Sequence, residues 1–125
     1  MCIRDSHIRS LDWHEGQLRA TSGQTAAAIA LMRRGSRPND EGGDSLYHAA
    51  TVAFLERDRS KLLAIMDKIK SMPKPQWFEQ VAEQARQNGM KVPPWPVHAS
   101  EVSGLINCFD KPYSQAYTYA CRESR

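Results

Sequence analysis

Several common features are absent from this chain of 125 residues, and each absence argues against a class of protein. No apolar run approaches the roughly 20 residues that cross a bilayer, so we expect no membrane-spanning helix. Neither Gly-x-Ser-x-Gly nor Gly-x-x-x-x-Gly-Lys occurs, so two frequent signatures of nucleophile and phosphate sites are missing. No segment alternates apolar and polar residues with a period of two, which argues against β-strands.

The net charge of the chain is also small. The 17 lysines and arginines stand against 14 aspartates and glutamates, and the formal net charge is only +3. The largest basic cluster is Arg33, Arg34 and Arg37, so we expect no nucleic-acid partner. The length and the hydrophobic content of 41% predict one soluble globular domain with a core of its own.

Cysteine is sparse, with three residues and no Cys-x-x-Cys sequence. Cys108 and Cys121 lie on either side of a turn at residues 110–112. The helix after that turn is expected to run to about residue 122, so the two residues are offset along the hairpin by roughly 10 Å, at 1.5 Å per residue. A disulfide requires Cα atoms within about 7 Å, so we predict two separate thiols.

The first six residues, Met1-Cys2-Ile3-Arg4-Asp5-Ser6, require separate treatment. They lack the apolar stretch of a secretory signal. They resemble the adaptor-derived starts of some open reading frames from environmental sequencing, and the alternative is an ordinary frayed tail. We therefore expect residues 1–7 to lie outside the fold. If they are an artefact, Cys2 is not native and the true N-terminus is missing. The compartment is then open: we expect a soluble protein that is cytoplasmic, or periplasmic or secreted if the missing segment carries a signal.

The remaining residues, 8–125, predict a single all-α domain of about seven helices. Apolar residues recur at helical spacing, between helix-ending residues, in the segments 8–22, 24–34, 45–56, 59–71, 76–88, 100–109 and 112–122. Asp58 is well placed to cap the fourth helix. Residues 36–44 form a loop, and the prolines of residues 92–97 impose an extended segment. The helices pair into antiparallel hairpins at about 8–35, 45–72 and 99–122, with the helix at 76–88 as an extra element.

An internal repeat is the sharpest signal in the sequence. One constant shift places Trp13 on Tyr47, His14 on His48, and the segment 28–32 on the segment 62–66. The shift corresponds to a period of 34, which is typical of stacked helix-turn-helix units. With the spacing Gly16-x6-Gly23-x4-Ala28, the chain resembles the tetratricopeptide repeat family, over residues 11–73 well and over residues 100–122 weakly. The resemblance implies stacked antiparallel hairpins and a non-catalytic module that binds a protein or peptide.

The sequence also departs from that family's pattern. Glu15 and Arg19 stand where the family prefers an apolar residue and an aromatic one. Arg57 replaces the glycine of the turn, at a cost of about 1 kcal/mol if the residue must be left-handed. An irregular helical bundle is therefore the alternative to a stacked array.

The resemblance implies a groove lined from the first helices of two hairpins. We expect the binding residues to be Arg9, Trp13, His14, Arg19, Tyr47 and His48. Trp13 and Tyr47 fall at positions that face the groove in this family, although both also fit simple packing between helices. Trp95, between two prolines, is expected to cap the end of the array, and an exposed recognition residue is the alternative.

Catalysis by histidine is the competing interpretation. His14 and His48 lie one repeat apart, on helices that would pack about 8–10 Å from each other. Two ligands fall short of the three or four that a metal site needs, and Glu15 points about 100° away from His14. We therefore expect no metal, no cofactor and no catalytic residue. The alternative is a small helical enzyme or accessory domain with His14, His48 or His98 as acid-base groups.

Overall fold

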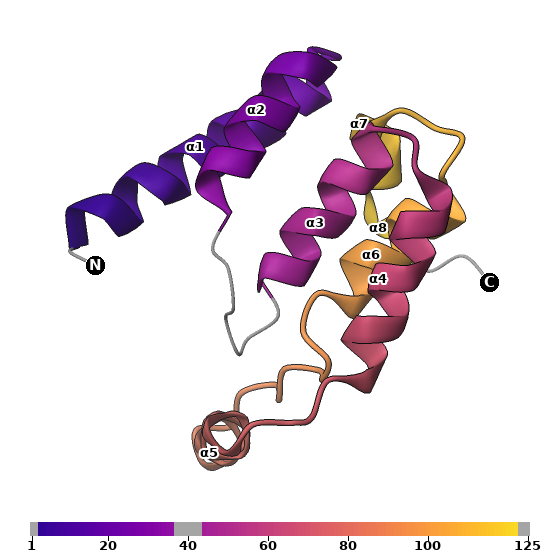
Figure 1. The fold of residues 1–125 in the computed structure, drawn as a ribbon. Coiled ribbons are helices and arrows are strands. Elements are labelled where there is room, and N and C mark those ends of the chain that lie inside the picture. The colour runs from indigo at the N-terminus through magenta and orange to yellow at the C-terminus, as the bar shows by residue number, and fades with distance from the viewer. Residues whose placement is uncertain (1–2, 37–43, 123–125) are drawn as a thin grey trace.

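A computed structural model describes residues 3–36 and 44–122. This part of the chain contains eight helices and no strand, which confirms the predicted all-α class (Figure 1). The helices are α1 (Ile3–Thr21), α2 (Thr25–Gly35), α3 (Asp44–Leu55), α4 (Arg59–Ser71), α5 (Gln76–Gln87), α6 (Ala99–Asn107), α7 (Tyr113–Ala116) and α8 (Tyr119–Arg122). The loop predicted at residues 36–44 lies almost entirely outside the described residues. None of the described helices is both long and apolar enough to cross a membrane.

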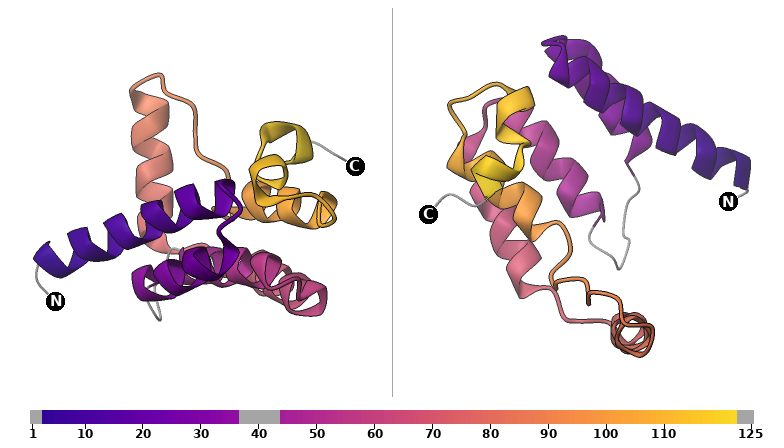
Figure 2. Two further views of the ribbon diagram at one scale, coloured as in Figure 1. Left: turned by 90° about the horizontal axis from the view of Figure 1, so that it is seen from above. Right: turned by 180° about the vertical axis from the view of Figure 1, so that it is seen from behind.

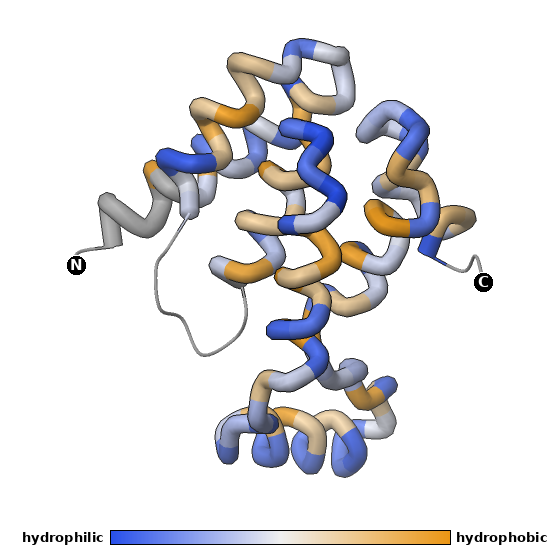
Figure 3. The backbone as a smooth tube through the Cα atoms, turned by 45° about the vertical axis from the view of Figure 1, so that its right-hand side comes forward, coloured by the Kyte–Doolittle hydropathy of each residue, from blue (hydrophilic) through white to orange (hydrophobic). Residues whose placement is uncertain are grey.

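The helices pack as three hairpins and one separate helix. α1 pairs with α2, α3 pairs with α4, and α6 packs against both α7 and α8. These pairs correspond to the hairpins predicted near residues 8–35, 45–72 and 99–122. α5 stands away from the three hairpins (Figure 2), and its hydrophobic residues lie on one side of the helix and its hydrophilic residues on the other (Figure 3). Its Phe78 ring meets Trp95 edge-on at 4.9 Å, so Trp95 packs on α5.

Two helix boundaries show how local sequence sets the elements. Asp58 precedes α4, and its carboxylate accepts a hydrogen bond from the Lys61 backbone N–H at 3.1 Å, as expected of a cap. α1 begins at Ile3 and therefore includes residues that the sequence interpretation set aside as a tail.

The first two hairpins follow the period of the sequence repeat. α1 ends at Thr21 and α3 ends at Leu55, which is the matching position one repeat later. α2 and α4 begin at Thr25 and Arg59, which are also matching positions. Both intervening turns contain one residue with positive φ, which is Gly23 (82°) in the first and Arg57 (58°) in the second.

One hydrophobic core joins the three hairpins. Its largest fully buried side chains come from every hairpin and are Met32, Phe54, Leu62, Ile69, Val102 and Leu105. Full burial of one such side chain stabilises the fold by about 1.5–3 kcal/mol. The core therefore holds the hairpins together as one body.

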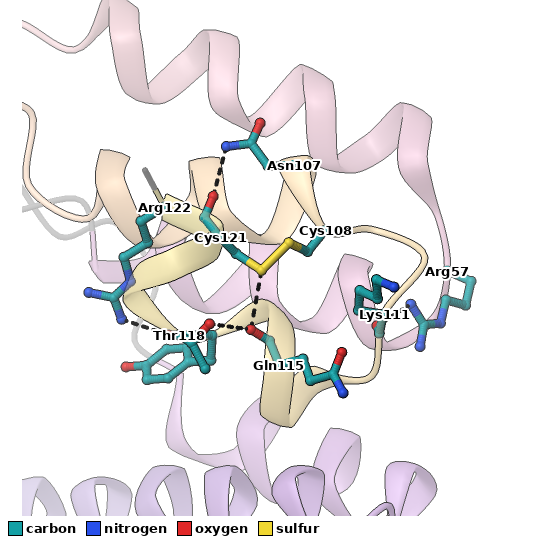
Figure 4. The surroundings of a disulfide bond; sticks show 9 residues. Arg57, Asn107, Cys108, Lys111, Gln115, Thr118, Cys121 and Arg122 are labelled. Carbon is teal, nitrogen blue, oxygen red and sulfur yellow. Dashed lines mark hydrogen bonds between the residues drawn. A yellow bond between two sulfur atoms is a disulfide. The ribbon is translucent and has the colours of Figure 1, made fainter. Parts of the chain in front are cut away.

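The prediction for the C-terminal cysteines is wrong, because the helix expected at 112–122 is not continuous. The chain turns between α7 and α8, where the Thr118 side chain and backbone N–H both donate to the Gln115 carbonyl oxygen, at 2.7 and 3.1 Å. α8 then packs back along α6. Cys108 and Cys121 are consequently joined by a disulfide, with their Cα atoms 5.9 Å apart (Figure 4). We call residues 112–122 the C-terminal hook.

Candidate functional site

Aromatic rings from three elements stack between the hairpins. The Trp13 ring of α1 lies over the His48 ring of α3, with centroids 3.7 Å apart, and meets the Tyr47 ring at 5.6 Å. Tyr47 stacks in turn on His98, at 4.3 Å, just before α6. Trp13 is 7% exposed and Tyr47 is 5% exposed. These two residues therefore pack between helices rather than line an open groove.

Hydrogen bonds extend this stack to the C-terminal hook. The Tyr47 hydroxyl donates to the Tyr117 hydroxyl at 2.9 Å. Gln17 Nε2 approaches both oxygens, at 3.5 Å from Tyr47 and 3.4 Å from Tyr117. Burial and the bond to Tyr117 raise the pKa of Tyr47 above its usual range. Tyr47 is thus neutral, and the network connects α1, α3 and the C-terminal hook.

His14 and Arg19 lie apart from the stack. His14 is exposed, with Nδ1 3.2 Å from the Gln17 side-chain oxygen. Arg19 pairs with Glu15 at 3.0 Å and donates to the Gln24 side chain at 2.6 Å. The Arg9 side chain lies outside the described residues.

The structure thus brings together three of the six predicted residues, Trp13, Tyr47 and His48. It does not unite all six in one groove, because the space between α1 and α3 is filled by the rings themselves. The exposed pair of Arg19 and Glu15 contributes little stability, since solvent screens it.

A groove of about 310 Å³ lies between α1 and the C-terminal hook. We call it the α1–α7 groove, and its lining residues are His14, Gln17, Leu18, Thr21, Tyr113 and Tyr117. The rings of Tyr113 and Tyr117 stack with centroids 5.3 Å apart and form one wall. Burial raises the pKa of Tyr113 above its usual range, so its hydroxyl is neutral.

An apolar stripe on α1 continues from this groove. Leu18 is 69% exposed, and Ile8 and Leu11 are also large exposed apolar residues of α1. Their spacings of three and seven residues place them on one side of the helix. Exposed apolar side chains grouped beside a concave surface are typical of an interaction site.

Sequence reasoning missed the residues of the hook. Tyr113 and Tyr117 lie in the segment 100–122, where the resemblance is weak, and neither they nor Gln17 were predicted as site residues. The available signal was Tyr113-x3-Tyr117, because residues four apart lie on one face of a helix. The contact of that face with α1 depends on the turn of the hook and has no local signal.

A second pocket, of about 280 Å³, lies beside α2, α3 and α4. Its lining includes Arg33, His48 and Lys61, and the Arg33 guanidinium already pairs with Glu56. Elsewhere, His98 Nδ1 lies 3.2 Å from Glu101, and this hydrogen bond lowers the pKa of the Glu101 carboxyl. Among the residues that the structure describes, no group of three or more His, Cys, Asp or Glu is arranged to hold a metal ion.

Comparison with known proteins finds no similar protein. No family model, no curated protein and no solved structure matches this chain. The α1–α7 groove is the site that joins a concave surface, aromatic walls and an exposed apolar side chain. Its chemistry suits an uncharged apolar or aromatic group.

Proposed function

We propose that this chain is a non-catalytic, tetratricopeptide repeat-like helical module that binds a protein or peptide segment in the α1–α7 groove. The proposal rests mainly on the exposure of Leu18, a large apolar side chain that is 69% exposed at the edge of a concave surface. Exposing such a side chain to water forgoes the free energy of its burial. A partner that covers Leu18 would gain this free energy of burial.

The groove lining indicates the chemistry of the bound segment. The buried Tyr113 ring supports the partly exposed Tyr117 ring, on which an aromatic or branched apolar side chain packs well. The hydroxyl of Thr21 donates to the backbone oxygen of Gln17 at 3.0 Å and keeps its own oxygen as an acceptor. An extended segment with one apolar anchor and backbone N–H donors fits this set.

The spacing of the helix ends supports the repeat-like part of the proposal. In the two N-terminal hairpins, the first helices end and the second helices begin at matching positions of the repeat, as in stacked units. The binding surface differs from the one that the resemblance implies. Between α1 and α3 the aromatic stack fills the space, whereas the groove between α1 and the hook is open.

A library of displayed random peptides tests the proposal, with the full oxidised chain as bait and fluorescence anisotropy as the measure of affinity. We expect selection of peptides with an apolar anchor. Leu18→Ser should then weaken binding of a selected peptide at least tenfold, because the anchor loses its apolar contact.

Leu63→Ser is the matched control, since Leu63 is an exposed leucine of α4 that does not line the groove. This variant should bind the selected peptide with unchanged affinity. Equal affinities for the parent chain and Leu18→Ser would contradict the proposal. So would a selection that yields no peptide with saturable binding.

A further inference from the structure

We propose that the disulfide between Cys108 and Cys121 is a redox-controlled clamp, which holds the C-terminal hook as one wall of the α1–α7 groove and releases that wall when it is reduced. The release is an event within this chain. Its effect on ligand binding rests on the proposed function.

The hook has little stability of its own. It consists of two helices of four residues each, α7 and α8, separated by a turn. Isolated helices shorter than about 12 residues are marginal in water. The hook therefore depends on its attachments to the rest of the molecule.

Most of these attachments connect the hook to α6 (Figure 4). The disulfide joins Cys121 to Cys108, and Asn107 donates from its side chain to the Cys121 carbonyl oxygen at 2.9 Å. Gly104 allows the hook to approach closely, since a Cβ atom there would lie 2.9 Å from the Ala116 carbonyl oxygen. The disulfide is the one covalent bond in this set, apart from the chain itself.

The opposite side of the hook contacts the N-terminal hairpins. Tyr117 accepts the hydrogen bond from Tyr47 in α3 and lies 3.4 Å from the side-chain nitrogen of Gln17 in α1. Tyr113 and Tyr117 are also the aromatic wall of the groove. The disulfide thus connects α6 covalently to the residues that shape the groove.

The reaction is a thiol–disulfide exchange with a dithiol reductant. A thiolate of the reductant attacks the sulfur of Cys108, which is more exposed than the buried Cys121, and Cys121 leaves as a thiolate that takes up a proton. The second thiol of the reductant then displaces Cys108. Two electrons and two protons pass to the cysteines, and the reductant becomes a disulfide. The freed Cys121 thiol has an acceptor nearby, because its sulfur lies 3.3 Å from the Gln115 carbonyl oxygen.

Hydrogen exchange measured by mass spectrometry tests the clamp. The full chain carries Cys2→Ser, so that only Cys108 and Cys121 react, and it is compared before and after reduction with dithiothreitol. We expect the amides of residues 113–122 to exchange at least tenfold faster after reduction, while α3 and α4 exchange as before. The control adds Cys108→Ser and Cys121→Ser. It should behave like the reduced chain and should not respond to dithiothreitol.

Four other outcomes would each decide part of the proposal. Equal exchange of residues 113–122 in the two redox states would overturn the clamp. Faster exchange throughout α3 and α4 would also overturn it, because the disulfide would then stabilise the whole fold. If the hook loosens after dithiothreitol treatment but the peptide binds with unchanged affinity, the clamp does not control the groove. A hook that loosens in a chain that binds no peptide in either state would support the clamp and contradict the proposed function.

Discussion

Single residues in this protein combine an unfavourable local conformation with favourable contacts, and Arg57 is the clearest case. Its φ of 58° lies in the left-handed region, which costs a residue with a side chain about 1 kcal/mol. The guanidinium compensates by donating to the backbone oxygens of Phe109 and Lys111, at 2.6 and 3.3 Å. It also lies 4.7 Å from the centre of the Phe54 ring. Arg57 thereby ties the turn after α3 to the segment before the hook.

Arg57→Ala and Arg57→Gly separate these two effects. Alanine loses the contacts and keeps the strain, so we expect it to lower the free energy of unfolding by about 1–2 kcal/mol. Glycine loses the same contacts but relieves the strain, so it should be about 1 kcal/mol more stable than the alanine variant. Urea unfolding followed by circular dichroism measures both. A glycine variant no more stable than the alanine variant would refute the strain at this turn.

Glu101 gives the protein a predictable response to acid. The hydrogen bond with His98 lowers the pKa of the Glu101 carboxyl, so this carboxylate stabilises the folded state above its ordinary pKa. That contribution is lost as the pH falls through the lowered pKa. We therefore expect Glu101→Gln to reduce stability near neutral pH and to have a shrinking effect toward pH 3. Urea titrations of both chains across this range provide the test, and a pH-independent difference would count against it.

At the scale of elements, sequence predicted the helices best where local residues determine their ends. The bounds of α4 were predicted to the residue, because Asp58 caps its start and Pro73 follows closely after its end. The break between α7 and α8 could not be predicted in the same way. It is accompanied by the close approach at Gly104 and the bridge to Cys108, both of which join residues from separate elements. Distance along an assumed continuous helix therefore gave the wrong answer for the cysteines.

The aromatic stack is one of the contacts that attach the first hairpin to its neighbours. Trp13→Ala should lower the free energy of unfolding by about 3–5 kcal/mol, because it empties a buried site between α1 and α3. Leu11→Ala, on the exposed side of the same helix, should change it by no more than about 0.5 kcal/mol. Thermal and urea unfolding of the two variants measure the contrast. Similar losses from the two changes would contradict the packing role of Trp13.

At the scale of the whole molecule, the groove arises from residues that are far apart in the sequence. Residues 14–21 supply one side, and Tyr113 and Tyr117, near the other end of the chain, supply the second. The internal repeat pointed to α1, whose His14 is exposed and lines the groove. It could not indicate the second wall, because the hook lies beyond the two hairpins that share the period of the repeat. The groove is thus a property of the assembled fold.

One measurement tests this account most directly, and it is the map of amide chemical shifts when a selected peptide is added to the ¹⁵N-labelled, oxidised full chain. We predict that the largest changes fall in residues 14–21 and 113–118, on both sides of the α1–α7 groove. Largest changes in α5, or around the pocket of Arg33 and Lys61, would contradict the central claim that this groove is the binding site.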